Sequence, residues 1–222
     1  MWPVGTIGRL KSELSNREYN KGTDIPITVG ILLMDYSKYS QFIDTRVKVN
    51  GTRKNIIDVL NSDTGDYIDF YIPGYASSNE IKIDGNCRDY YTTQMEIDGK
   101  TDYQFSPKFY DDAIDELQKD FCIDLSGESY LILVEWNDGR FNKDNFYKVD
   151  LKSDLDKIFY LKGSNAELFH MLISVSKKEV AFKAFKNKLR ACKAEVVARK
   201  AMKQAAIEIT KSDLINIIQK LL

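Results

Sequence analysis

The chain has 222 residues, of which 43% are hydrophobic and 29% are charged, and its formal net charge is −1 at pH 7. This composition is globular and excludes a disordered or fibrous chain. A chain of this length buries enough surface on folding to need no disulfide or metal for stability.

The supply of cysteine and histidine limits the chemistry that the chain can perform. It holds three widely spaced cysteines, Cys87, Cys122 and Cys192, and one histidine, His170. An odd number of cysteines makes a poor disulfide framework, and most zinc sites draw on clustered cysteines and histidines. We therefore expect no metal and no other cofactor. The start of the chain carries no secretory signal, and its apolar runs are too short for a membrane helix, so we expect a cytoplasmic protein.

The first third of the chain predicts a helix followed by a buried strand. Ile7, Leu10 and Leu14 recur at helical spacing and predict an amphipathic helix over residues 5–18. The continuous apolar run of residues 26–34 predicts a strand inside a sheet that is covered on both faces. The next predicted elements are a helix, a strand with a turn, a second helix and a strand, over residues 36–44, 47–51, 55–60 and 67–72.

The middle of the chain predicts an antiparallel insertion and then a helix. Residues 80–83 and 90–97 read as short strands ended by turn residues. Ser106 and Pro107 are typical of a helix start, with serine as N-cap and proline at the first helical position. The predicted apolar face of this helix holds Phe109, Ala113, Leu117 and Phe121.

A hairpin follows this helix. Residues 130–136 form a second apolar strand, Asn137-Asp138-Gly139 is a turn sequence, and residues 146–151 alternate as a partner strand. Residues 153–176 read as short helices. The succession of elements predicts an α/β protein with a mixed sheet flanked by helices.

The order of the elements over residues 25–151 loosely resembles a thioredoxin-type arrangement. This resemblance implies a fold and no activity, because the CxxC pair of redox thioredoxins is absent from the chain. Three short segments are also similar to parts of accessory domains associated with bacterial defence, although no family can be named from them. These segments are residues 70–75, 105–109 and 126–128.

Charge is distributed unevenly along the chain. Residues 177–222 hold twelve Lys and Arg against four Asp and Glu, a net charge of +8, which leaves −9 for residues 1–176. We therefore divide the chain into an acidic α/β domain over residues 1–176 and a basic helical segment over residues 177–222. Such asymmetry predicts an acidic partner for the basic segment, or docking of that segment on its own acidic body.

The basic segment contains a narrow apolar seam. Its positions alternate at spacings of three and four residues, as in a coiled coil, and they are Phe182, Phe185, Leu189, Cys192 and Val196. A seam of this kind either covers its own domain, pairs with a partner or a second copy, or leaves the surrounding lysines to bind nucleic acid. The residues that we expect to contact a partner are Phe182, Phe185, Leu189, Lys186 and Lys193.

One catalytic hypothesis rests on the spacing of Asp69, Glu80 and Lys82. Nucleases of the PD-(D/E)xK type place two carboxylates on adjacent strands to hold Mg²⁺, with a lysine that assists the attack of water. The pattern is common by chance in a chain this rich in charged residues. The pattern is better explained by an ordinary strand residue at Asp69 and by outward-facing hairpin residues at Glu80 and Lys82.

The leading hypothesis is a non-enzymatic adaptor, an accessory component of a bacterial defence system, whose basic C-terminal helices bind a protein partner or a second copy. The first alternative is the Mg²⁺-dependent nuclease. The second is a nucleic-acid-binding protein that works through residues 177–222.

Overall fold

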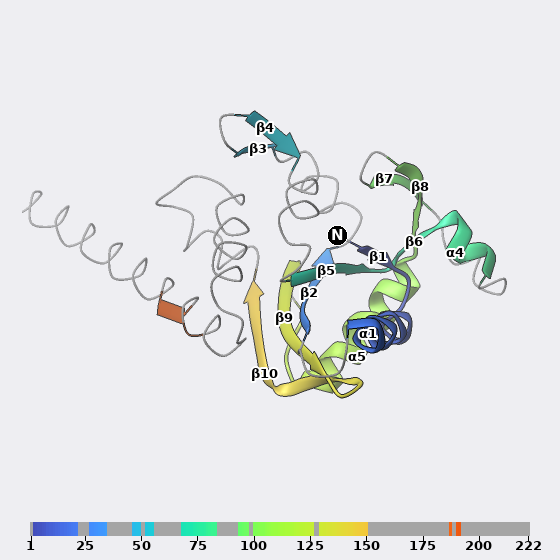
Figure 1. Cartoon of the computed structure of the whole chain (residues 1–222). Coiled ribbons are helices and arrows are strands. Elements are labelled where there is room, and N and C mark those ends of the chain that lie inside the picture. Colours follow the sequence, from blue (N-terminus) through green and yellow to red (C-terminus); the bar gives the residue numbers. More distant parts are fainter. Residues whose placement is uncertain are drawn as a thin grey trace, which may run out of the picture.

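Figure 1 shows the chain as a computed structural model. The structure describes residues 2–21, 27–34, 46–49, 52–55, 68–83, 93–97, 100–126, 129–150, 187 and 190–191.

A five-stranded mixed sheet forms the body of the protein, and it confirms the predicted α/β class. In spatial order its strands are β1 (Trp2–Val4), β5 (Ile68–Pro73), β2 (Ile27–Met34), β9 (Ser129–Asn137) and β10 (Arg140–Asp150). The first three strands run parallel, β9 is antiparallel to β2, and β10 is antiparallel to β9. Sequence analysis missed β1, a three-residue edge strand. Its Pro3 is tolerated because an edge position requires fewer backbone hydrogen bonds.

Two long helices pack against this sheet. In α1 (Ile7–Lys21), the predicted apolar residues Ile7, Leu10 and Leu14 are at most 1% exposed, which confirms the opening helix. In α5 (Pro107–Phe121), the Ser106 Oγ accepts a hydrogen bond from the Phe109 amide, as predicted for the N-cap. The buried face of α5 starts at Tyr110, not at Phe109, and continues through Ala113, Leu117 and Phe121.

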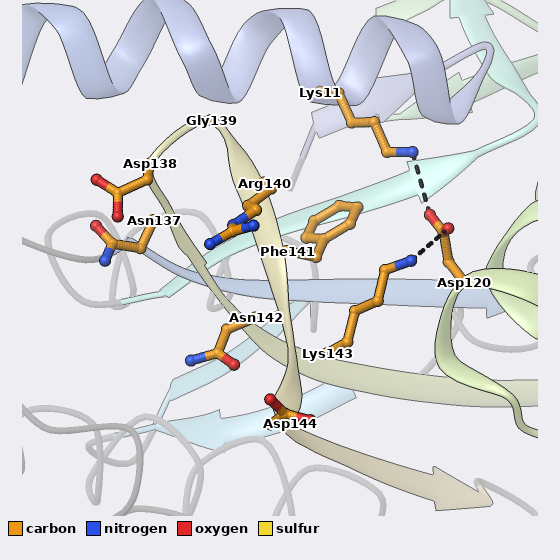
Figure 2. Close-up of a pocket in the computed structure, with 10 residues that line it drawn as sticks. All are labelled: Lys11, Asp120, Asn137, Asp138, Gly139, Arg140, Phe141, Asn142, Lys143 and Asp144. Carbon is orange, nitrogen blue, oxygen red and sulfur yellow. Dashed lines mark hydrogen bonds and ion pairs between the residues drawn. The ribbon is translucent and has the colours of Figure 1, made fainter.

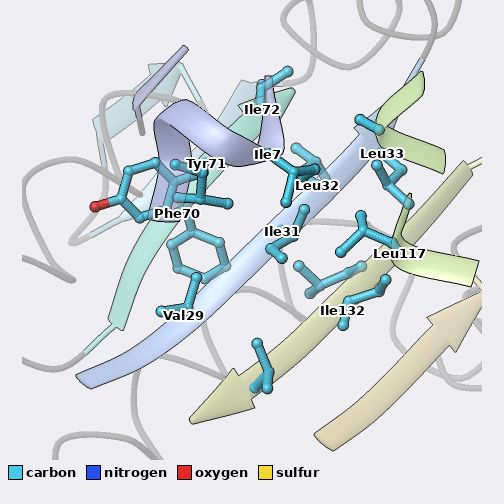
Figure 3. Close-up of a cluster of buried hydrophobic side chains, with 14 of the residues drawn as sticks. Ile7, Val29, Ile31, Leu32, Leu33, Phe70, Tyr71, Ile72, Leu117 and Ile132 are labelled. Atoms are coloured by element: carbon cyan, nitrogen blue, oxygen red, sulfur yellow. The ribbon is translucent and has the colours of Figure 1, made fainter. Parts of the chain in front are cut away.

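Both helices lie on one face of the sheet. Val29 and Ile31 of β2 pair in register with Val134 and Ile132 of β9, and these four residues share the helix-facing side. Figure 3 shows Ile7 of α1 and Leu117 of α5 among the side chains of these two strands. The central strands are buried on the opposite face as well, as predicted for β2. The helices predicted over residues 36–44 and 153–176 lie outside the described residues. So does the helix predicted over residues 55–60, except for Asn55, which is the last residue of a strand and not helical.

The opposite face contains a close contact that requires glycine. Gly30 of β2 pairs with Phe70 of β5, and a Cβ atom built on Gly30 would lie 2.5 Å from the Phe70 ring. Any side chain at position 30 would displace this aromatic ring, which is 1% exposed. The glycine therefore lets two central parallel strands pack a phenylalanine over their shared surface.

A second, smaller sheet follows β5. It consists of β6 (Tyr75–Ser77), β8 (Lys100–Phe105) and β7 (Thr93–Ile97), all antiparallel, which confirms the antiparallel insertion over its second part. The predicted strand at residues 80–83 is wrong, because these residues belong to α4 (Ser78–Ile83), a short helix. Four residues with isoleucine at every second position are too few to distinguish the two-residue period of a strand from the 3.6-residue period of a helix.

The predicted strand and turn near residue 50 is part of a separate β-ribbon. It is formed by β3 (Arg46–Val49) and β4 (Thr52–Asn55), which pair antiparallel and join no other strand of the described residues. In Figure 1 the ribbon lies apart from the five-stranded sheet.

No helix among the described residues is long and apolar enough to cross a lipid bilayer.

Replacement of Gly30 by alanine tests the contact between the two central strands. We expect Gly30→Ala to lower the free energy of unfolding by about 1 to 3 kcal/mol, because the new methyl group overlaps the Phe70 ring. Gly8→Ala is the matched control, since Gly8 is exposed in α1 and the nearest atom to its added Cβ lies at 3.9 Å. This control is expected to be neutral or to stabilise by up to about 1 kcal/mol. Urea denaturation of the full chain measures both, and equal effects would contradict the packing described.

Candidate functional site

The C-terminal half of α1 carries two adjacent charged residues that reach different parts of the sheet. Arg17 contacts β5, and Glu18 contacts the turn between β9 and β10. Helical geometry sets neighbouring residues about 100° apart, so one helix places a cation and an anion over two separate strands.

Arg17 neutralises a buried carboxylate. Its Nη1 lies 2.8 Å from Oδ1 of Asp69, whose side chain is 7% exposed, and the same nitrogen donates a 3.2 Å hydrogen bond to the Tyr71 hydroxyl. Asp69 and Tyr71 share the helix-facing side of β5. Burial raises the pKa of the Tyr71 hydroxyl to about 12, although the hydrogen bond from Arg17 opposes the shift. Tyr71 therefore stays a neutral phenol near neutral pH, beside the Arg17 guanidinium.

Glu18 holds the hairpin turn. One carboxylate oxygen accepts hydrogen bonds from Trp136 Nε1 at 2.9 Å and from the Gly139 amide at 3.1 Å, and the other accepts from the Asp138 amide at 2.8 Å. Glu18 is 8% exposed and Trp136 is 1% exposed. A buried carboxylate is stable when donors of this kind satisfy its oxygens. We call this arrangement the Glu18 clamp.

The turn that the clamp holds has positive φ at both central residues. These values are 52° for Asp138 and 71° for Gly139, and they connect the register pair of Asn137 and Arg140. A two-residue loop with this backbone is the type I′ turn that Asp-Gly favours, which confirms the predicted turn.

Strand β10 bulges directly after the turn. Phe141 pairs with Trp136 and Phe146 pairs with Val134, so five steps along β10 match two steps along β9. Bulges of this kind re-aim side chains and end regular pairing at sheet edges. Here the bulge carries four consecutive polar residues, 142–145.

The turn and the bulge of the hairpin, together with α1 and α5, form the walls of a surface concavity of about 780 Å³. Figure 2 shows the residues that line it, with Asn137, Arg140 and Asn142 pointing to one side and an ion-paired trio on the other. The lining residues are Lys11, Asp120, Asn137, Asp138, Gly139, Arg140, Phe141, Asn142, Lys143 and Asp144.

The ion-paired trio consists of Lys11, Asp120 and Lys143. The two ammonium groups lie 3.2 and 3.0 Å from the Asp120 carboxylate, and Lys11 also lies 2.6 Å from Glu116. Partial burial disfavours ionised Asp120, but the hydrogen bonds from Lys143 and Lys11 outweigh burial and hold its pKa below the ordinary value of 3.8. Burial likewise opposes the charge on Lys11, yet its two carboxylate partners raise its pKa above 10.5.

This concavity is suited to binding polar groups. Asp120 is neutralised by two lysines and is therefore unsuited to accept a proton near neutral pH. Arg140 is exposed, and its guanidinium forms no hydrogen bond or ion pair within the described part of the chain, so this group is available to a ligand or a protein partner. Among the described residues, no three Asp, Glu, His or Cys side chains are grouped to hold a metal ion.

The three predicted nuclease residues do not all lie in the elements that the hypothesis requires. Asp69 lies in β5 as expected and is paired with Arg17. Glu80 and Lys82 lie in α4, so the second carboxylate is on a helix and not on an adjacent strand. The side chains of Glu80 and Lys82, and all five predicted partner-binding residues, Phe182, Phe185, Leu189, Lys186 and Lys193, lie outside the described part of the chain.

Sequence analysis missed the Glu18 clamp and the Arg17 pair. A charged residue near the end of an amphipathic helix is typical of a solvated position, and the partners of Glu18 lie 118 to 121 residues away. Only the Asp-Gly turn was visible in the sequence.

Comparisons with models of known protein families, with curated proteins and with solved structures give no match.

Substitution of Glu18 tests the clamp. We expect Glu18→Gln to lower the free energy of unfolding by about 2 to 3 kcal/mol, because its amide nitrogen cannot accept a hydrogen bond. At least one of the three donors, which include the buried Trp136 indole, is then left unpaired. Glu116→Gln is the control, since its carboxylate is 42% exposed on the same helical layer and its loss should cost less than about 1 kcal/mol. Urea denaturation followed by tryptophan fluorescence measures both. Equal, small effects would contradict the clamp.

Acid titration tests the ion-paired trio. The folded-state pKa of Asp120 is lowered, so its ionisation stabilises the fold above the unfolded pKa of about 4, and this contribution is lost as the pH falls through the folded pKa. The difference in unfolding free energy between the parent chain and Asp120→Asn should therefore be present at pH 6 and vanish toward pH 2. A difference that is constant with pH would show that the trio is not held by charge.

Proposed function

We propose that the chain is a non-enzymatic interaction protein that associates through the apolar seam of its basic C-terminal segment. The α/β body serves as a rigid scaffold, and a second copy of the chain is the partner that the seam fits best. Spacings of three and four residues favour a helix of the same kind as the binding partner, because knobs-into-holes packing needs matching periods.

The observation that carries the proposal concerns three described residues of this segment. Asn187, Arg190 and Ala191 are helical and exposed. At about 100° per residue, these positions fall on the side of a helix opposite to the predicted seam of Phe182, Phe185 and Leu189. A helix that is solvent-exposed on that side and apolar on the other is suited to pairing through the apolar side.

The body supports a scaffolding role. Its buried carboxylates, Glu18 and Asp69, both bind partners that fix α1 to the sheet. Buried ionisable groups committed to structure in this way favour rigidity over proton transfer.

We also propose a thioredoxin-type arrangement for the body, without redox chemistry. The strands of the large sheet lie in the order first, third, second, fourth, fifth by their succession in the chain. Three parallel strands followed by an antiparallel hairpin support this arrangement. The absence of CxxC from the whole sequence removes the redox pair and leaves the fold free for binding.

The Mg²⁺-dependent nuclease is a weaker hypothesis than the interaction protein. It requires Asp69 to bind a cation, whereas the Asp69 carboxylate is paired with Arg17, and it requires Glu80 on a neighbouring strand, whereas Glu80 lies in α4.

Light scattering coupled to gel filtration tests the proposed association. We expect the full chain to elute at twice the monomer mass or more. Phe182→Asp and Leu189→Asp should each return it to the monomer, because a carboxylate in the seam is costly to bury. Asn187→Asp is the matched control: it introduces the same charge on the exposed side of the helix and should leave the mass unchanged.

Three outcomes would contradict self-association through the seam. They are a monomer for the parent chain at every concentration, dissociation by Asn187→Asp as readily as by Leu189→Asp, and unfolding of the whole body by the seam substitutions. A ratio of absorbance at 260 to 280 nm that high salt lowers would favour nucleic acid as the ligand of the basic segment.

A further inference from the structure

We propose that the β3–β4 ribbon is a DNA-binding element that enters the major groove of a duplex. Its residues, 46–55, are distinct from those of the C-terminal segment and of the hairpin concavity. DNA binding by the ribbon can therefore be tested independently of the association proposed above.

The ribbon concentrates positive charge within an otherwise acidic body. Residues 46–55 contain four Lys and Arg and no Asp or Glu, whereas residues 1–176 as a whole carry a net charge of −9. The four cations are Arg46, Lys48, Arg53 and Lys54. A polyanion is the partner that such a cluster attracts most strongly.

The register of the ribbon places three of these cations together. Arg46 pairs with Asn55 and Lys48 pairs with Arg53, and successive residues of a strand alternate between its faces. One face of the ribbon therefore holds positions 46, 48, 53 and 55, every one of which is a hydrogen-bond donor. The other face holds Val47, Val49, Thr52 and Lys54.

The shape of the ribbon fits the major groove of B-form DNA. Each strand has four residues, which span roughly 13 Å, and two paired strands lie about 4.8 Å apart. The major groove is about 12 Å wide and 8.5 Å deep and admits a two-stranded ribbon of this size. Only two residues, Asn50 and Gly51, separate the two strands in the sequence.

The face with positions 46, 48, 53 and 55 carries side-chain donors that complement the acceptors on base edges in the major groove. Arginine and lysine bind the O6 and N7 acceptors of guanine, and asparagine binds adenine. A membrane surface would favour apolar residues beside the cations, and none occupies this face. The narrow major groove of A-form RNA would exclude the ribbon, which makes duplex DNA the expected ligand.

Fluorescence anisotropy with a labelled 20-base-pair DNA duplex tests the proposal on the full chain. The triple variant Arg46→Gln, Lys48→Gln, Arg53→Gln should bind at least about tenfold more weakly. Loss of three cations from the groove should also reduce the slope of log K against log salt, by up to about 2.7 where each cation displaces one counterion. The matched control removes three charges from the basic segment through Lys183→Gln, Lys188→Gln and Arg190→Gln, and it should retain most of the affinity.

A comparison of single lysines on the two faces sharpens the test. Lys48→Gln should weaken binding several-fold, whereas Lys54→Gln, on the valine-containing face, should have a smaller effect. The charge-conserving triple Arg46→Lys, Lys48→Arg, Arg53→Lys, with unchanged circular dichroism, separates loss of charge from loss of folding and should keep the salt dependence. No DNA binding by the parent chain, loss of binding only in the basic-segment variant, equal effects of Lys48→Gln and Lys54→Gln, or equal affinity for an RNA duplex would each overturn the proposal.

Discussion

The carboxylate of Glu18 is the contact on which the arrangement of the body depends. It ties the C-terminal end of α1 to the indole of Trp136 and to both amides of the β9–β10 turn. One helical position earlier, Arg17 ties the same helix to Asp69 in β5. These contacts are polar and directional, so they fix the rotation of α1 over the sheet, which the apolar packing of Ile7, Leu10 and Leu14 alone would leave less defined. The Lys11 contacts with Glu116 and Asp120 then bring α5 against α1 on the same face.

A body held in this way is a platform for the charged elements around it. The hairpin concavity exposes Arg140 beside asparagine amides, and the β3–β4 ribbon gathers three cations on one face. The basic C-terminal segment adds a net charge of +8. The two proposals assign different ligands to different elements, a second copy of the chain to the seam and duplex DNA to the ribbon. Together they describe a protein that assembles and binds DNA through elements carried on a rigid acidic body.

The sequence predicted the parts of the fold whose signals are local. Strands β2 and β9 were found because their apolar runs are continuous, the turn because Asp138-Gly139 tolerates positive φ, and α5 because Ser106 and Pro107 open a helix. Strand β1 was missed because three edge residues have no periodicity. Helix α4 was read as a strand because Ile81 and Ile83 alternate over too short a run. The Glu18 clamp and the Asp69 ion pair join residues that lie 52 to 121 positions apart, and the hairpin concavity brings Lys11 to Asp120, 109 positions later. No local pattern encodes such contacts.

Amide hydrogen exchange, measured by NMR on the unmodified full chain, tests the clamp most directly. The amides of Asp138 and Gly139 lie in an exposed turn, where an unbonded amide exchanges rapidly. If Glu18 accepts hydrogen bonds from both amides, they should be protected from exchange to a degree comparable with the amides of β9. They should exchange only when α1 leaves the sheet. Exchange of both amides at the rate of an open turn, alongside a protected β9, would contradict the account.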